Sequence, residues 1–345
     1  MRRSLVKGDG EGAGLYQSKE FIACSFSAKN EKTHLLTLTG EPDWSLILWK
    51  WDSSKIQAMI NIGFSLPQTP NMPFQCSFNP FDPNAVIVTG PSTYKYLKIQ
   101  DTEFVIDHSQ LNNLDYGHMH HPKEGSLNYV CHAWMTDTAR IVVCTEAGDI
   151  MVCENSGEFY TYVERDERQK IKAIVPYGKG FVLGYGNGMF TAYERYEDGQ
   201  SGIATYRRFK EVFTSLEQPY QLTNFPVSSM VLTTTEDQIY FITENNQLLK
   251  VNFSLDGLEE KSKFEYVICN FHSMAVTGMD VCIRKQLVVT CSRDKTIRIW
   301  NYANRTLEIV SGVLSDETLA VAFHPSGFHV ICALLDKISI YNVLG

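Results

Sequence analysis

The sequence predicts an all-β protein built from about seven small antiparallel sheets of four strands each. Almost every apolar segment is short, rich in Val, Ile, Phe, Tyr and Thr, and closed by Gly, Pro, Asn or Asp, which is the pattern of a strand and a turn. No stretch longer than about ten residues keeps the 3.6-residue apolar period of a helix. The strands also fall into groups at spacings of roughly 40 to 55 residues, which predicts the repeated blades of a β-propeller.

Each group begins with an apolar strand that often ends in an aromatic residue, and these first strands lie at residues 21–26, 74–78, 129–134, 171–175, 227–231, 276–281 and 319–323. A second strand follows at residues 35–39, 85–89, 141–144, 181–184, 239–242, 287–291 and 329–333. Third strands after a tight turn include residues 46–51, 150–154, 248–253, 296–301 and 338–342, and more polar fourth strands include 56–62 and 306–310. We therefore expect one propeller domain over residues 1–345, with blades that start near residues 21, 74, 129, 171, 227, 276 and 319.

The last group has only three strands before the sequence ends, and an unpaired strand edge invites aggregation unless another segment covers it. A ring of blades can close when an N-terminal strand joins the last blade. Residues 2–6, Arg-Arg-Ser-Leu-Val, have a suitable length and character. We expect them to complete the seventh blade beside residues 338–342.

The composition limits the classes of partner. The chain has 31 Lys and Arg against 39 Asp and Glu, and no basic block that could follow a phosphate backbone, so we expect no nucleic-acid partner. No apolar run approaches the ~20 residues that span a bilayer, and no signal peptide opens the sequence, so we expect a soluble intracellular protein without a membrane partner. The nine cysteines are scattered and form no C-x-x-C pair, which predicts reduced core thiols and no zinc ribbon.

The clearest repeat lies at residues 272–310. His272 precedes a strand, Thr290 lies on the next strand, Asp294 lies in the following turn and Trp300 lies on the third strand. This segment resembles a WD40 repeat, including the run Ser-Arg-Asp-Lys-Thr-Ile-Arg-Ile-Trp that ends at Trp300. The resemblance implies that these four side chains form a hydrogen-bonded chain. Its role would be structural, because a buried Asp and His need partners for their polar atoms.

A catalytic His272–Asp294 pair is the alternative interpretation of this repeat. It would need a nucleophile beside it, and the Trp six residues after Asp294 favours the structural role. The first group keeps part of the repeat pattern in Asp43 and Trp49.

Further motifs are similar to the N-terminal WD-repeat region of the cilia- and flagella-associated protein 57 family. They lie at residues 263–267, 276–279, 282–285, 297–302 and 324–327, and weaker similarity extends through residues 181–183, 88–90 and 48–51 to near Arg2. The resemblance implies a non-enzymatic scaffold of the ciliary or flagellar axoneme that supports assembly or regulation of inner dynein arms. It implies axonemal, dynein-arm or microtubule-associated proteins as partners, and no cofactor. A generic cytosolic WD40 adaptor, such as a ubiquitin-ligase substrate receptor, is the alternative, and a propeller enzyme is a third possibility.

A polar insertion at residues 194–210 offers the best candidate for a docking site. We expect its segment Tyr206, Arg207, Arg208 and Phe209 to expose aromatic rings mixed with arginine, as the energetically dominant residues of protein interfaces do. The simpler interpretation is a solvated hairpin.

Other possible sites have simpler explanations. His118, His120 and His121 lie close enough in sequence to hold a transition metal, but the nearest thiol, Cys131, lies on an expected strand, and we expect an exposed His-rich loop and no metal site. The glycines of residues 184–188 precede a strand and not a helix, so they predict a turn and not a phosphate-binding loop. We find no catalytic motif and expect no enzyme activity.

Overall fold

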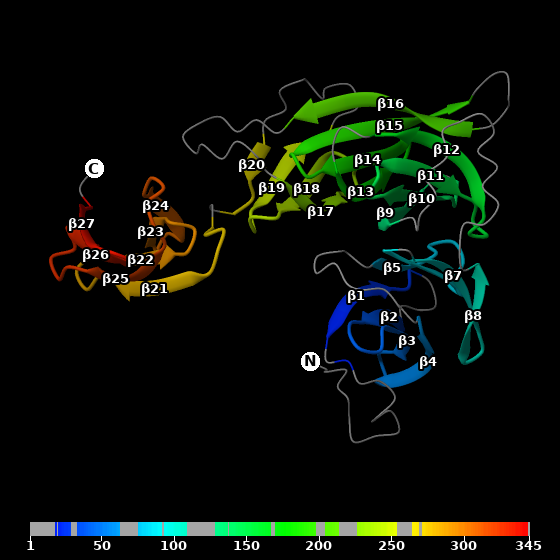
Figure 1. The fold of residues 1–345 in the computed structure, drawn as a ribbon, viewed down its shortest axis with the longest axis horizontal. Coiled ribbons are helices and arrows are strands. Elements are labelled where there is room, and N and C mark those ends of the chain that lie inside the picture. The colour runs from blue at the N-terminus through cyan, green and yellow to red at the C-terminus, as the bar shows by residue number, and fades with distance from the viewer. Residues whose placement is uncertain are drawn as a thin grey trace. The chain divides into compact units, whose positions relative to one another are not determined.

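The computed structural model describes residues 18, 20–28, 33–62, 75–91, 93–108, 128–136, 138–166, 170–197, 204–213, 226–253, 264–268 and 271–343. Within these residues the protein contains 27 strands and no helix (Figure 1). The strands form seven antiparallel sheets, which we number as blades 1 to 7 in chain order. The chain divides into two compact units, Met1–Val212 and Phe213–Gly345.

The first unit holds blades 1 to 4, and in each of them neighbouring strands follow the order of the chain. Blade 1 comprises β1 (Phe21–Phe26), β2 (His34–Thr39), β3 (Ser45–Lys50) and β4 (Lys55–Asn61), and blade 2 comprises β5 (Gln75–Phe78), β6 (Ala85–Gly90), β7 (Thr93–Gln100) and β8 (Glu103–His108). Blade 3 comprises β9 (Tyr129–Trp134), β10 (Ile141–Thr145), β11 (Asp149–Cys153) and β12 (Phe159–Arg165), and blade 4 comprises β13 (Ile171–Tyr177), β14 (Gly180–Tyr185), β15 (Met189–Glu197) and β16 (Ala204–Phe213).

The second unit holds blades 5 to 7. Blade 5 comprises β17 (Val227–Leu232), β18 (Gln238–Thr243), β19 (Leu248–Asn252) and β20 (Phe264–Tyr266), and blade 6 comprises β21 (Val276–Val281), β22 (Leu287–Ser292), β23 (Ile297–Asn301) and β24 (Thr306–Val310). Blade 7 has three strands among the described residues, namely β25 (Thr318–Phe323), β26 (His329–Leu334) and β27 (Ile338–Asn342). The first strand of every blade begins within one residue of the position expected from the sequence.

Each central blade of the first unit buries both of its faces. Along β6, Val86 and Val88 join a core shared with blade 1, whereas Ala85 and Ile87 join a core shared with blade 3. Alternate residues of a strand point to opposite faces, so one short apolar run supplies two cores. This explains why β6 carries apolar residues at consecutive positions and not only at alternate ones.

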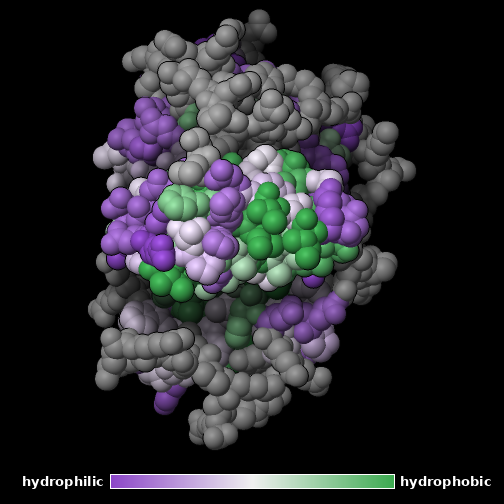
Figure 2. All heavy atoms as spheres, turned by 90° about the vertical axis from the view of Figure 1, so that its left-hand side faces the viewer, coloured by the Kyte–Doolittle hydropathy of each residue, from purple (hydrophilic) through white to green (hydrophobic). Residues whose placement is uncertain are grey.

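Blades 6 and 7 share a core in the same way. Val289 and Cys291 of β22 pack with Val330 and Cys332 of β26. The opposite face of blade 7 also carries apolar side chains. Ile338 and Ile340 of β27 lie on it and are 72% and 67% exposed. Figure 2 shows apolar side chains gathered on the side of the second unit where β25–β27 lie.

The expected strand at residues 2–6 lies outside the described residues, and it stays a prediction. The expectation that residues 1–345 form a single domain also stays a prediction, since the chain divides into two compact units.

Candidate protein-docking surface

The repeat in blade 6 joins its four side chains in the expected order. The Nδ1 atom of His272 lies 2.9 Å from Oδ2 of Asp294, and its Nε2 atom lies 2.8 Å from Oγ1 of Thr290. The indole N–H of Trp300 donates to the same hydroxyl at 2.8 Å. One tautomer satisfies the chain: Nδ1–H donates to Asp294, and the Thr290 hydroxyl donates to Nε2.

The electrostatics of Asp294 follow from this chain. Burial would raise the pKa of its carboxyl group, but hydrogen bonds from His272 and Thr296 and from the backbone of Ser273 lower that pKa to about 2. The hydrogen bonds of His272 join the segment before β21 to β22 and to the turn between β22 and β23. These contacts favour the structural role over the catalytic one.

Blade 1 keeps two parts of the pattern without a histidine between them. The indole N–H of Trp49 donates to Oγ1 of Thr37 at 2.8 Å, as Trp300 does to Thr290 in blade 6. Asp43 accepts the backbone N–H of Ser18 at 3.0 Å, which corresponds to the contact between Asp294 and the backbone of Ser273.

A second buried histidine network was not foreseen from the sequence. His132 of β9 contacts Ser77 of β5 at 2.6 Å and Thr89 of β6 at 2.7 Å, and the indole N–H of Trp134 donates to Ser77 at 2.9 Å. The side chain of Gln75 bonds the backbone N–H and carbonyl of His132. This network ties blade 2 to blade 3. A histidine in the middle of an apolar strand was the signal that could have revealed it.

The docking candidate at residues 206–209 lies on β16, in a long hairpin with β15. Tyr206 is 4% exposed, because its ring packs 5.2 Å from that of Phe181. The expectation that Tyr206 is exposed is therefore wrong. Phe209 is 46% exposed, and Arg207 is exposed with its guanidinium 5.0 Å from the ring of Tyr196.

Arg208 is partly buried, because its side chain is 29% exposed and its guanidinium group contacts acidic residues of the protein. Its guanidinium contacts Glu164 at 3.1 Å, Glu211 at 2.8 Å and the fully buried carboxylate of Asp166 at 3.4 Å. Glu164 belongs to β12, so Arg208 links blade 4 to blade 3. The docking hypothesis is therefore confined to Arg207 and Phe209 within this segment.

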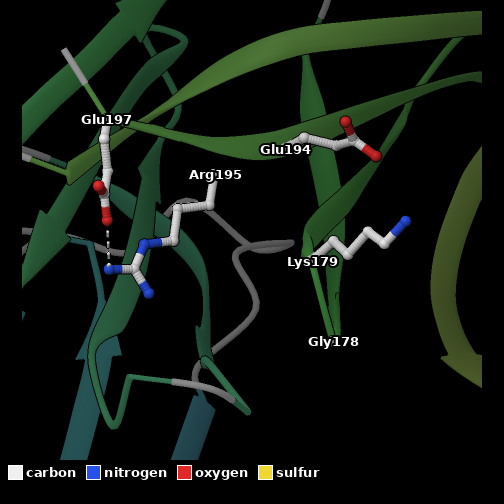
Figure 3. A pocket seen from close by; sticks show the side chains of 5 residues that line it. All are labelled: Gly178, Lys179, Glu194, Arg195 and Glu197. Atoms are coloured by element: carbon white, nitrogen blue, oxygen red, sulfur yellow. Dashed lines mark hydrogen bonds and ion pairs between the residues drawn. The ribbon is translucent and has the colours of Figure 1, made fainter. Parts of the chain in front are cut away.

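An open pocket of about 460 Å³ lies beside the same hairpin. Gly178 and Lys179 of the β13–β14 turn line it together with Glu194, Arg195 and Glu197 of β15. Figure 3 shows Arg195 and Glu197 pointing toward each other, and their charged groups are 3.4 Å apart. Small-molecule sites are mostly apolar, whereas charged side chains line this pocket, so it suits contact with another protein's surface.

Among the described residues there is no group of three or more His, Cys, Asp or Glu that could hold a metal ion, and His118, His120 and His121 lie outside those residues. No helix long and apolar enough to cross a bilayer occurs in the described part of the chain. Eight cysteines in it are free thiols, and all of them except Cys24 are buried.

Comparison with known proteins identifies the repeat. The WD40 family, described as "WD domain, G-beta repeat", matches residues 264–301, which contain the four-residue chain of blade 6. The chain is a WD40-repeat protein. Its seven small antiparallel sheets are those of a seven-bladed WD40 propeller.

Two relatives of this WD40 chain are named as cilia- and flagella-associated proteins. Cilia- and flagella-associated protein 57 A of Tetrahymena thermophila is 32% identical over 354 residues, covering 95% of this chain and 25% of the relative. Cilia- and flagella-associated protein 57 of Mus musculus is 26% identical over 379 residues, covering 95% of this chain and 28% of the relative. The WD40 chain thus spans about a quarter of the length of these relatives.

A solved structure is similar to the WD40 chain in fold alone. The crystal structure of Chaetomium thermophilum Raptor matches with a TM-score of 0.54 and 9% identity, over 94% of this chain and 28% of that one. An identity this low carries no information about function.

Proposed function

We propose that the protein is a non-enzymatic WD40 scaffold of the ciliary or flagellar axoneme, which supports assembly or regulation of inner dynein arms through protein–protein contacts. The observation that carries the proposal is similarity over 95% of the chain to relatives named cilia- and flagella-associated proteins. The absence of a catalytic motif in the sequence and the structural use of His272 and Asp294 support a role in binding.

The hairpin of β15 and β16 supplies the proposed docking surface. Arg207 and Phe209 alternate with the inward-facing Tyr206 and Arg208, as the period of a strand requires. An exposed aromatic ring beside an exposed guanidinium is a common composition at the centre of protein interfaces. The charged pocket next to the hairpin extends this surface.

The proposal is tested by expressing the tagged chain in a ciliated cell and extracting the cilia with detergent. We expect the chain to remain with the insoluble axoneme. Release into the soluble fraction would contradict the axonemal role, and co-purification with a ubiquitin-ligase subunit would favour the cytosolic adaptor instead.

A double variant then tests the docking surface. Arg207→Glu combined with Phe209→Ala removes the two exposed contacts and leaves Tyr206 and Arg208 in place, so we expect a folded protein with less axonemal retention. Arg284→Glu is the matched control, because it reverses an exposed charge on another turn. Equal retention of the double variant and the wild type would exclude this hairpin as the docking surface.

A further inference from the structure

An open crevice of about 260 Å³ lies between blades 1 and 2, beside the core that they share. Leu48 and Ile99 are among the residues that line it, together with the polar side chains of His34, Gln57, Asn84 and Asp101. These residues come from both blades, within the first unit. The crevice lies on blades 1 and 2, whereas the docking hairpin belongs to blade 4.

The corresponding junction between blades 2 and 3 is closed. The hydroxyl of Tyr94 donates to the carbonyl of Gly157 at 2.7 Å, and that of Tyr96 donates to the carbonyl of Asn155 at 2.6 Å. Both carbonyls belong to the turn at residues 154–158, between β11 and β12. The turn lies so close to Tyr96 that a Cβ atom on Gly157 would be 2.5 Å from its ring.

The register of the strands shows why the first junction stays open. Leu48 pairs with the third residue of β2, and Tyr96 pairs with the third residue of β6. Each of the two faces the next blade, since Leu48 packs in the core shared by blades 1 and 2 and Tyr96 in the core shared by blades 2 and 3. Blade 1 therefore has a leucine where blade 2 has a tyrosine.

The turn on the other side of the crevice, between β7 and β8, is also shorter than the β11–β12 turn of the next junction. Asp101 and Thr102 alone connect β7 to β8, whereas residues 154–158 connect β11 to β12. The amide of Gln57 donates to the carbonyl of Asp101 at 3.3 Å, so a single long hydrogen bond replaces the two tyrosine contacts. The space that the longer turn fills in the next junction remains empty here.

The residues that line the crevice fit a long side chain with a cation at its end. Leu48 and Ile99 provide an apolar floor, while His34 and Gln57 bond to each other at 2.7 Å and form a wall. The carboxylate of Asp101 and the side-chain amide of Asn84 make no hydrogen bond to another residue in the described part of the chain. Lys and Arg bury an aliphatic stem against apolar surface and keep the charged end at a polar rim.

Size and charge support the same occupant. The volume of about 260 Å³ is below the range of roughly 300–1,000 Å³ typical of small-molecule sites, so it suits one inserted side chain. The net charge of −8 also favours approach of a basic partner. We propose that this crevice binds a Lys or Arg side chain of a partner protein, with Asp101 and Asn84 as the contacts of its charged group.

The proposal is tested with a random heptapeptide library displayed on phage and selected on the intact chain, in parallel with Asp101→Asn. Asp101 adopts a φ of 53°, a conformation that Asn tolerates, so the variant keeps the turn. We expect the wild type to enrich peptides that contain Lys or Arg. A fluorescein-labelled copy of an enriched peptide should bind Asp101→Asn about 10-fold to 100-fold more weakly by fluorescence polarisation, as expected for loss of a charge-assisted hydrogen bond.

Glu103→Gln is the matched control, because it removes the same charge from an exposed residue at the start of β8. We expect it to bind the labelled peptide like the wild type, and Asn84→Ala to weaken binding. Enrichment of acidic peptides, absence of any peptide whose binding depends on Asp101, or equal losses in Asp101→Asn and Glu103→Gln would overturn the proposal. Binding that survives Arg207→Glu with Phe209→Ala would separate this site from the docking hairpin.

Discussion

His132 shows how a buried polar residue can serve the packing of two blades. Burial lowers the pKa of its imidazole from 6.5 to about 3, so the ring is neutral in the folded protein. A neutral imidazole can donate one hydrogen bond and accept another, which matches its contacts with Ser77 and Thr89.

This pKa predicts an acid-sensitive contribution to stability. The unfolded chain binds a proton at His132 below a pH of about 6.5, whereas the folded chain does so only near pH 3, so acidification through this range favours unfolding. His132→Gln should be less stable than the wild type at pH 7, and the difference should narrow toward pH 4. The free energy of unfolding in urea at several pH values measures this, with the exposed His329→Gln as control. A constant difference across the pH range would contradict the assignment.

The hydrogen-bonded side chains of blade 6 predict that substitution of Thr290 lowers the free energy of unfolding more than substitution of an exposed threonine. Thr290→Val keeps the shape but leaves the buried Nε2 of His272 and the indole N–H of Trp300 without their common partner. We expect a loss of about 1–3 kcal/mol in the free energy of unfolding. Thr306→Val in the same blade should change it by less than about 0.5 kcal/mol, and equal effects would show that the hydrogen bonds contribute nothing.

The two histidine networks also show the limits of sequence analysis at this scale. His272, Thr290, Asp294 and Trp300 lie within one repeat, so their spacing revealed them. The partners of His132 belong to a different blade, and no local spacing connects residues 75–89 with residue 132.

Among the elements, the β11–β12 turn depends on a single glycine. Gly157 has a φ of +88°, and a Cβ atom there would lie 2.5 Å from the ring of Tyr96. Gly157→Ala should therefore destabilise the junction of blades 2 and 3 by about 1–3 kcal/mol, because it combines backbone strain with overpacking. Gly312→Ala is the control, since no atom beyond its own residue and its two chain neighbours lies within 4 Å of the added Cβ. Thermal unfolding distinguishes the two, and equal melting temperatures would contradict the described contact.

The β16 segment shows why composition alone gave the wrong exposure for the side chain of Tyr206. Residues 206–209 look uniformly exposed because they mix aromatic rings with arginine. The segment is a strand, however, and alternate side chains of a strand point to opposite faces. Tyr206 and Arg208 therefore face the protein, whereas Arg207 and Phe209 are exposed. An interpretation of the segment as a strand would have predicted this alternation.

For the molecule as a whole, the repeat pattern predicted the architecture well. Apolar runs such as residues 85–90 must be buried on both faces, and stacked small sheets achieve this. The closure of blade 7 could not be derived in the same way, because no apolar pattern specifies which strand pairs with β27.

The closing strand gives a prediction for the whole molecule. Deletion of residues 2–6 should expose the edge of β27, lower the melting temperature and increase aggregation. Deleting residues 8–12 instead should have a smaller effect, because only the first segment is proposed to pair. A deletion of residues 2–6 that leaves both properties unchanged would exclude this closure.

The central claim is that the chain docks axonemal partners through the β15–β16 hairpin. Cross-linking mass spectrometry of detergent-extracted axonemes that carry the tagged chain tests it most directly. We predict that Lys179, which lines the pocket, and Lys210, which follows Phe209, form cross-links to inner dynein arm proteins, and that Arg207→Glu with Phe209→Ala reduces them. Cross-links to those proteins from other lysines but from neither Lys179 nor Lys210 would contradict the claim.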